Sequence, residues 1–215
     1  MEAVNIFENE TAGSEEIKEV LIGRFKASFF RRMLGPESLF FWPKGGFEIN
    51  SQSLPALVYA TLTKDWQRKT VDIQVEERKP FGILCGSACY WFDEEGVLFD
   101  QAPESKGFLI PKVLDENQRN LNLNDQIFGK PEFTQNLIDL MRQMQETGIL
   151  KPRSFTIKNL NLQEIHIETD GPALYFNLRS MPKDIDQILS GVNQHKKLQN
   201  LSYIDLRVEN RVYYR

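Results

Sequence analysis

The sequence is poor in the residues that most often carry chemistry. It has two cysteines and two histidines among 215 residues. With so few histidines, general acid–base catalysis has few candidates. The glycine-rich phosphate-binding motifs, the nucleophile elbow and the His-Glu-x-x-His zinc motif are also missing from the sequence. We therefore expect no catalytic residues, no metal site and no cofactor.

Long apolar runs and a surplus of positive charge are missing as well. The best apolar stretch, residues 54–62, contains Pro55 and is far shorter than the roughly 18 residues of a membrane-spanning helix. The sequence starts without the basic and apolar regions of a signal peptide. Its net charge is −4, whereas nucleic-acid binders are usually basic. We therefore expect no nucleic-acid partner.

The two cysteines and two histidines have ordinary structural interpretations. Cys85 and Cys89 flank a Gly-Ser turn, so a hairpin can bring them into a disulfide or leave them as free thiols. A zinc site would need both His166 and His195 as further ligands. We instead expect His166 on the exposed face of a strand and His195 at a solvated helix end. The enzymatic alternative is a hydrolase that uses His166 near Asp170.

The first part of the chain predicts a small α/β domain, residues 1–78. Residues 4–7 alternate like a short strand, and Ser14 can cap a helix. A second helix is predicted at 53–60, where Pro55 suits the first turn. Residues 70–77 alternate apolar and polar side chains, which predicts a half-buried strand. Pro80 marks the start of a second domain, residues 79–215.

The second domain reads as a mostly antiparallel β-sheet with two packed helices, so the whole chain is α+β. The apolar stripe of residues 130–147 predicts one helix, and Pro182 opens the other. Turns at the cysteines and at Gly96 separate three predicted strands, at residues 81–85, 89–92 and 97–99. Further strands are predicted at residues 154–158, 163–169, 173–179, 202–208 and 211–214.

Residues 24–44 combine five basic side chains and six aromatic ones with a single acid, Glu37. Such a stretch suits a surface that meets anionic lipid headgroups or a partner protein. The alternative interpretation is that the aromatic side chains form the core of the first domain.

The C-terminal strand is the best candidate for partner binding. A last strand often lies at a sheet edge, where another chain can add a strand. Polar and apolar side chains alternate over 203–208, with Tyr203, Asp205 and Arg207 on one face and Ile204, Leu206 and Val208 on the other. Tyr and Arg, common in interface centres, follow. Residues 209–210 suit either a two-residue hairpin turn or a bulge. The alternative is a buried, paired last strand. The candidate residues are Tyr203, Asp205, Arg207, Val208, Glu209, Asn210, Arg211, Val212, Tyr213 and Tyr214.

Three segments carry motifs whose order and spacing are informative. Residues 71–80 read Val-Asp-Ile-Gln-Val-Glu-Glu-Arg-Lys-Pro. Residues 90–93 and 96–99 read Tyr-Trp-Phe-Asp and Gly-Val-Leu-Phe, and residues 203–207 read Tyr-Ile-Asp-Leu-Arg. Together they resemble the FtsQ/DivIB family of bacterial cell-division proteins, in which a POTRA domain runs into a β domain. The resemblance covers nearly the whole chain and is poorest over residues 26–46.

The resemblance implies an anchored, non-enzymatic protein. It implies a single membrane helix, absent from this sequence, and a folded part outside the cytoplasm at the division septum. The implied role is recruitment and regulation of divisome partners, chiefly FtsB and FtsL, by addition of a partner strand beside the last strands. The matching segment is 203–214, and Arg207 falls on the family's matching arginine. The alternative role is a POTRA-type module in protein transport or outer-membrane assembly.

Overall fold

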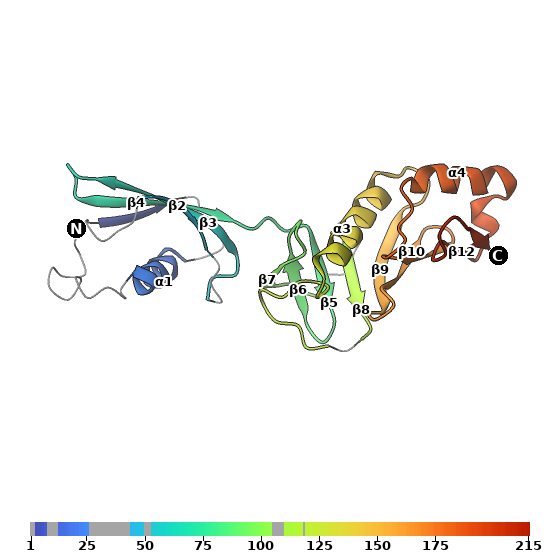
Figure 1. The fold of residues 1–215 in the computed structure, drawn as a ribbon, viewed down its shortest axis with the longest axis horizontal. Coiled ribbons are helices and arrows are strands. Elements are labelled where there is room, and N and C mark those ends of the chain that lie inside the picture. The colour runs from blue at the N-terminus through green and yellow to red at the C-terminus, as the bar shows by residue number, and fades with distance from the viewer. Residues whose placement is uncertain (1–2, 8–12, 26–43, 50–52, 105–109, 118) are drawn as a thin grey trace. The chain divides into compact units, whose positions relative to one another are not determined.

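The computed structural model describes residues 3–7, 13–25, 44–49, 53–104, 110–117 and 119–215. The chain divides into two compact units, Met1–Arg78 and Lys79–Arg215, which are described separately (Figure 1). Among the described residues there are three α-helices and two mixed sheets. The α+β class predicted from the sequence is therefore confirmed.

The first unit is a four-stranded sheet with helix α1. Its strands follow the order β1-β4-β3-β2, with β1 parallel to β4 and the other pairs antiparallel. Ile17 and Leu21 of α1 are fully buried in one cluster with Leu62 and Ile73 of the sheet, so α1 covers one face. The elements are β1 (Ala3–Phe7), α1 (Ser14–Phe25), β2 (Gly45–Glu48), β3 (Leu57–Asp65) and β4 (Thr70–Glu77).

The helix predicted at 53–60 is wrong. Pro55 lies in a turn instead, which the Leu57 N–H closes on the Leu54 carbonyl at 3.1 Å. β3 then starts at Leu57, because the Val-Tyr-Ala-Thr-Leu-Thr run favours a strand. A register shift between Leu57 and Tyr59 breaks the alternation that would have indicated this strand. The cationic aromatic surface predicted at 24–44 lies, apart from its ends, outside the described residues.

The second unit is a nine-stranded sheet with two helices. Its strand order is β13-β12-β11-β10-β9-β8-β5-β6-β7. The elements are β5 (Gly82–Cys85), β6 (Cys89–Phe92), β7 (Leu98–Gln101), β8 (Lys112–Asp115), α3 (Pro131–Glu146), β9 (Pro152–Asn159), β10 (Glu164–Thr169), β11 (Ala173–Asn177), α4 (Ile185–His195), a 3-10 turn (Leu198–Asn200), β12 (Tyr203–Asp205) and β13 (Tyr213–Tyr214).

The sheet of this unit is mixed but mostly antiparallel, as predicted, with five antiparallel pairs among its eight. Three strand pairs are parallel, namely β5 with β8, β8 with β9 and β11 with β12. For two of these pairs, the helix that connects the strands explains why they run parallel. The chain passes through α3 between β8 and β9 and through α4 between β11 and β12. A helical crossover returns the chain to the same end of the sheet, so the flanking strands run parallel.

The two faces of the sheet differ in chemistry. On one face a row of paired residues is fully buried or nearly so, and it packs with α3 and α4 into the core; its members are Leu84, Val113, Phe155, Ile167, Leu174 and Ile204. On the other face, called here the polar face, the adjacent row holds Thr156, His166, Tyr175 and Asp205. No helix in the described part of the chain is long and apolar enough to cross a membrane.

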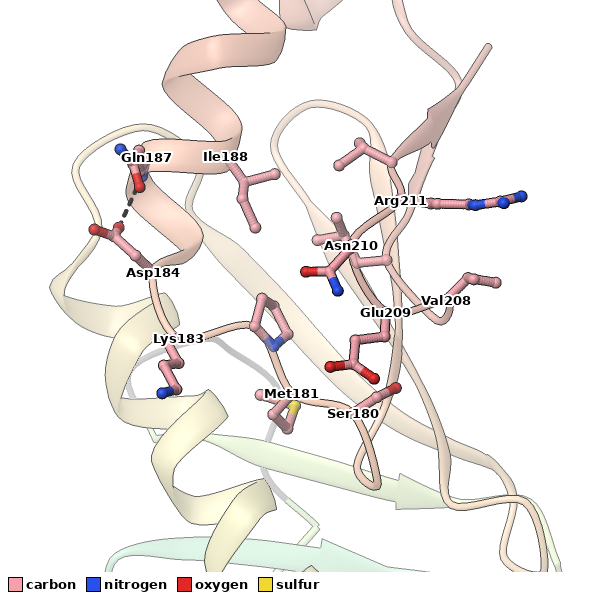
Figure 2. A pocket seen from close by; sticks show the side chains of 13 residues that line it. Ser180, Met181, Lys183, Asp184, Gln187, Ile188, Val208, Glu209, Asn210 and Arg211 are labelled. Carbon is pink, nitrogen blue, oxygen red and sulfur yellow. Dashed lines mark hydrogen bonds between the residues drawn. The ribbon is translucent and has the colours of Figure 1, made fainter.

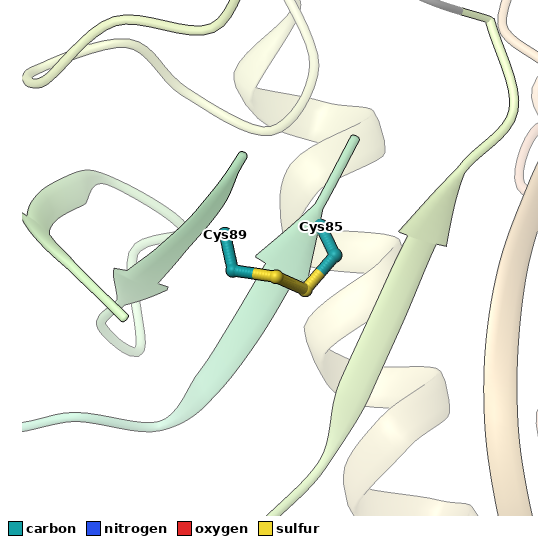
Figure 3. Close-up of a disulfide and its surroundings, with 2 residues drawn as sticks. All are labelled: Cys85 and Cys89. Atoms are coloured by element: carbon teal, nitrogen blue, oxygen red, sulfur yellow. A yellow bond between two sulfur atoms is a disulfide. The ribbon is translucent and has the colours of Figure 1, made fainter. Parts of the chain in front are cut away.

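The two cysteines form a disulfide at the end of the β5–β6 hairpin. Cys85 and Cys89 are directly opposed with a Cα–Cα distance of 4.1 Å. Figure 3 shows the bond on the side of the sheet away from the helix that packs behind it. There it joins a small apolar cluster with Ile83, Trp91 and Leu114. The bond therefore holds the hairpin closed on the side that the main core does not reach.

Helix α4 begins three residues later than Pro182, the predicted start. The Asp184 carboxylate accepts a hydrogen bond from the Gln187 backbone N–H at 2.8 Å and caps the helix. Capping satisfies an N–H that has no partner within the helix, so Asp184 fixes the boundary.

Candidate functional site

The second unit ends in short strands at one sheet edge. From β9 to β13 the strands contain 8, 6, 5, 3 and 2 residues. β13 pairs antiparallel with β12, with Ile204 opposite Tyr214 and Asp205 opposite Tyr213. β13 is therefore the edge strand, and it lies beside the strand that carries the first candidate residues.

The outer side of β13 presents backbone groups that another strand can use. Tyr203 and Arg215 exchange both backbone hydrogen bonds, at 3.3 and 3.4 Å. Antiparallel pairs alternate between hydrogen-bonded and non-hydrogen-bonded. The next pair, Ile204 with Tyr214, is therefore of the second kind, and the N–H and C=O of Tyr214 point away from β12.

The connection between β12 and β13 matches neither predicted form. It spans residues 206–212, longer than a two-residue turn, and it reverses the chain, unlike a bulge. The Arg211 N–H closes a turn on the Val208 carbonyl at 3.1 Å, with Asn210 at a φ of 58°. Asn tolerates this left-handed region better than most residues. Val208 lies in this connection, beyond the end of β12 at Asp205, and is 48% exposed.

Arg207 organises a charged cluster on the polar face, called here the Arg207 cluster. Its Nη2 and Nε donate to the two Asp205 carboxylate oxygens at 2.6 and 2.9 Å, and Nη1 donates to Glu164 at 2.5 Å. The guanidinium lies 5.6 Å from the Tyr175 ring centroid. The His166 Nε2 lies 2.8 Å from the same Glu164 oxygen. Three strands thus contribute to one network.

Two tyrosines extend the Arg207 cluster across the polar face. The Tyr175 ring stacks on Tyr203 at a centroid distance of 5.6 Å and lies 4.1 Å from the His166 ring. The candidate residues Tyr203, Asp205 and Arg207 are therefore brought together, and they meet Tyr175 and His166 from the neighbouring strands.

The carboxylates of the cluster are held in the charged form. Hydrogen bonds from Arg207 lower the pKa of Asp205 below its ordinary value of 3.8. Burial opposes ionisation of Glu164, but hydrogen bonds from His166 and Arg207 still lower the pKa of Glu164 below its ordinary 4.5. Hydrogen bonds to Asp205 raise the pKa of Arg207. One cation therefore lies between two carboxylates, and its charge is satisfied inside the protein.

A cleft of about 530 Å³ lies between the start of α4 and the segment 206–212. Figure 2 shows Asp184, Gln187 and Ile188 on one side, Val208, Asn210 and Arg211 on the other. Both apolar and charged side chains line the cleft, among them Met181, Ile188, Leu206, Val212, Lys183, Glu209 and Arg211.

Four large apolar side chains of the last eight residues stand exposed by 36–48%: Val208, Val212, Tyr213 and Tyr214. Clustered exposed apolar surface marks interaction sites.

The structure gives the two residues of the hydrolase alternative different partners. His166 contacts Glu164, whereas an Asp170 carboxylate oxygen accepts the Lys151 backbone N–H at 2.8 Å. His166 is also less exposed than predicted, with 24% of its side chain accessible. Among the described residues no group of three or more His, Cys, Asp or Glu side chains could hold a metal ion.

Sequence reasoning missed Glu164 and Tyr175 as members of the cluster. Glu164 precedes His166 by two residues on one strand, so alternation places both on one face. Tyr175 reaches them through the register of β10 with β11, which pairs it with His166. Periodicity within one strand carries no information on that register.

Comparison with protein-family models found no matching family, and comparison with curated proteins found no matching relative. The interpretation of the site therefore depends on its own geometry and on the sequence motifs.

Proposed function

We propose that this chain is the extracytoplasmic part of an FtsQ/DivIB-like scaffold of bacterial cell division. It works without catalysis at the septum, on the outer face of the cytoplasmic membrane, and holds FtsB-like and FtsL-like partners. The first unit is the POTRA-like domain and the second is the β domain. The observation that carries the proposal is the C-terminal edge, where the outward backbone of Tyr214 lies among exposed apolar side chains.

The motif residues have structural roles that support this assignment. Arg78 donates its backbone N–H to the Ala56 carbonyl at 2.7 Å and its Nε to the Pro55 carbonyl at 3.1 Å. The Asp93 carboxylate accepts the Glu95 and Val97 N–H groups at 3.0 and 2.9 Å, in a turn where Gly96 has a φ of 72°. Arg78 therefore shapes the end of the first unit, and Asp93 and Gly96 shape the turn of the β6–β7 hairpin in the second.

Strand addition at β13 explains how such a scaffold holds a partner. The partner strand takes the Tyr214 N–H and C=O as its first hydrogen-bonding pair, and backbone bonds supply affinity. Its alternate side chains meet Val212 and the adjoining cleft, which supply specificity. Since Arg207 is satisfied by Asp205 and Glu164, the exposed Arg211 and Arg215 are the arginines at this edge that can attract acidic partner residues.

The first test isolates the outward Tyr214 N–H. The chain is titrated with the extracytoplasmic segments of the host's FtsB-like and FtsL-like proteins, as wild type and as Tyr214→Ala, Tyr214→Phe and Tyr214→Pro. Proline is tolerated on the outer side of an edge strand but donates no hydrogen bond. We expect the proline variant to bind about tenfold more weakly than the alanine variant, since a net hydrogen bond contributes up to about 1.5 kcal/mol. Tyr214→Phe should bind like wild type.

The second test removes β13 and keeps the core. A chain that ends at Asn210 retains Ile204 and Leu206, which are 0% and 4% exposed. Circular dichroism should show the fold preserved while partner binding disappears. Undiminished binding by this shortened chain would place the partner elsewhere, and a failure of the intact chain to bind either segment would remove the proposed partners.

A further inference from the structure

The hairpin between β3 and β4 ends in a structured tip, residues 64–69, with the sequence Lys-Asp-Trp-Gln-Arg-Lys. An Asp65 carboxylate oxygen accepts the backbone N–H groups of Gln67 and Arg68, each at 2.9 Å. Lys69 completes the turn at a φ of 50°. These contacts fix the backbone of the tip, so its exposed side chains project from a defined support.

The side chains of the tip combine an exposed tryptophan with cations. Trp66 is 54% exposed, the highest value among the exposed large apolar side chains of the described residues. The Lys64 Nζ lies 5.6 Å from its ring centroid. The Arg68 side chain is 83% exposed, and Lys69 is exposed as well. Three cations and one acid thus gather at the tip of a chain whose net charge is −4.

This combination is suited to the surface of a membrane. The indole ring has an apolar body and a polar N–H, and tryptophan concentrates at the level of lipid headgroups. Basic side chains near an anionic leaflet are attracted to its phosphates, and each strengthens binding about fivefold. The tip is therefore a locally cationic feature of a chain whose overall charge is negative.

The sheet register places the tip beside the start of β1. β1 runs parallel to β4, with Ala3 opposite Thr70. The chain therefore enters the first unit at the sheet end where the tip lies, as Figure 1 shows for this unit. In the proposed function the membrane helix precedes this entry point, so the tip lies at the membrane-proximal end of the sheet.

We propose that the tip rests on the anionic headgroups of the membrane that anchors the chain. Trp66 lies in the headgroup layer, and Lys64, Arg68 and Lys69 pair with lipid phosphates. The inference rests on the membrane anchor of the proposed function, but it is independent of the partner site at β13. Its consequence is a second attachment point, which restricts rotation of the first unit about its anchor.

The contact is tested with the full chain tethered by an N-terminal hexahistidine tag to vesicles that contain a nickel-chelating lipid. The vesicles are phosphatidylcholine alone or with phosphatidylglycerol, and they carry a headgroup-level fluorescence quencher. The difference in emission between wild type and Trp66→Phe reports on Trp66. We expect it to be quenched on anionic vesicles, less so at high salt, and unquenched on neutral ones. An unquenched Trp66 on anionic vesicles, or equal quenching on both, would overturn the inference.

A matched pair of double variants tests the charges. Arg68→Gln with Lys69→Asn removes two tip cations, and asparagine keeps the positive φ. Lys151→Gln with Arg153→Gln removes two exposed cations from the second unit. Untethered binding to anionic vesicles should fall about 25-fold for the tip variant, at about fivefold per cation. An equal loss in the control would overturn the inference. The partner titration is repeated on the tip variant, and we expect its partner affinity to be unchanged. This control separates failure of the partner site at β13 from failure of the lipid contact at the tip.

Discussion

Replacement of Arg207 by methionine tests the charge network of the polar face. Methionine keeps an unbranched side chain and removes the guanidinium, which lies over the Tyr175 ring and donates to Asp205 and Glu164. The two carboxylates then lack their shared counter-charge. The Glu164→Gln variant and the double variant complete a mutant cycle, which isolates the contribution of the Arg207–Glu164 pair.

The expected magnitude follows from the exposure of the partners. The Arg207 side chain is 38% exposed, and those of Glu164 and Asp205 are 17% and 16% exposed. Partly solvated ion pairs contribute about 0.5–1 kcal/mol each after screening, and a cation above an aromatic ring adds about 0.5 kcal/mol at such a site. Arg207→Met should therefore lower the free energy of unfolding by about 2 kcal/mol at pH 7. The cycle should give a coupling energy of about 0.5–1 kcal/mol for Arg207 with Glu164.

The loss should depend on pH in a defined direction. The pKa values of Asp205 and Glu164 are lowered in the folded chain, so their contribution is fully present above the ordinary values of 3.8 and 4.5. It is lost as the pH falls through the lowered folded values. The Arg207→Met variant lacks most of this stabilisation by ionised Asp205 and Glu164 at every pH. The difference between wild type and Arg207→Met should therefore be largest at pH 7 and shrink below pH 4.5.

The assay is urea denaturation in a Trp42→Phe, Trp66→Phe background, where Trp91 alone reports on the second unit. Arg153→Met, an exposed arginine on β9, is the control and should change the free energy of unfolding by less than about 0.5 kcal/mol. A difference between wild type and Arg207→Met that stays constant from pH 7 to pH 3 would refute the electrostatic reasoning. It would mean that Arg207 acts through packing of its stem.

Three further changes probe other parts of the second unit by the same denaturation assay. Gly96→Ala should cost about 2 kcal/mol or more, because its φ is 72° and a Cβ there would meet the Thr134 side chain; equal stability would contradict the turn geometry. Joint replacement of Cys85 and Cys89 by serine should cost about 2 kcal/mol, since the disulfide closes a very short loop; reductant should reproduce the loss in wild type. Phe176→Ala, at 0% exposure, should cost about 3–5 kcal/mol; a loss below about 1 kcal/mol would contradict its burial.

Elements with an unbroken period were predictable from the sequence. The alternation of residues 70–77 gave β4 with the observed bounds, because Val71, Ile73 and Val75 face the core and nothing interrupts them. The apolar stripe of 130–147 likewise predicted α3 to within a residue. In both cases one face of the element is buried against the core, so the apolar residues recur at the period of that element and can be read from the local sequence.

Features set by contacts distant in sequence were not predictable. The bulge between Leu57 and Tyr59 disturbs the period of β3, so its first half read as a helix. The parallel pairs depend on how α3 and α4 cross the sheet. At the site, alternation found the shared face of Tyr203, Asp205 and Arg207. It did not find the turn that begins at Val208, because that turn depends on where β13 returns.

The shortening of the strands towards the C-terminal edge has a consequence for self-association. β12 and β13 contain three and two residues, so the edge offers few consecutive backbone groups to an incoming chain. Long flat edges invite copies of the same protein to stack into open-ended polymers, whereas short ones do not. A second copy of this chain would bring an equally short edge strand, so pairing of the two edges would form few backbone hydrogen bonds. In the proposed function, a partner that supplies its own extended segment and packs side chains on the neighbouring apolar surface gains more, so short edge strands favour a foreign strand over a second copy of this chain.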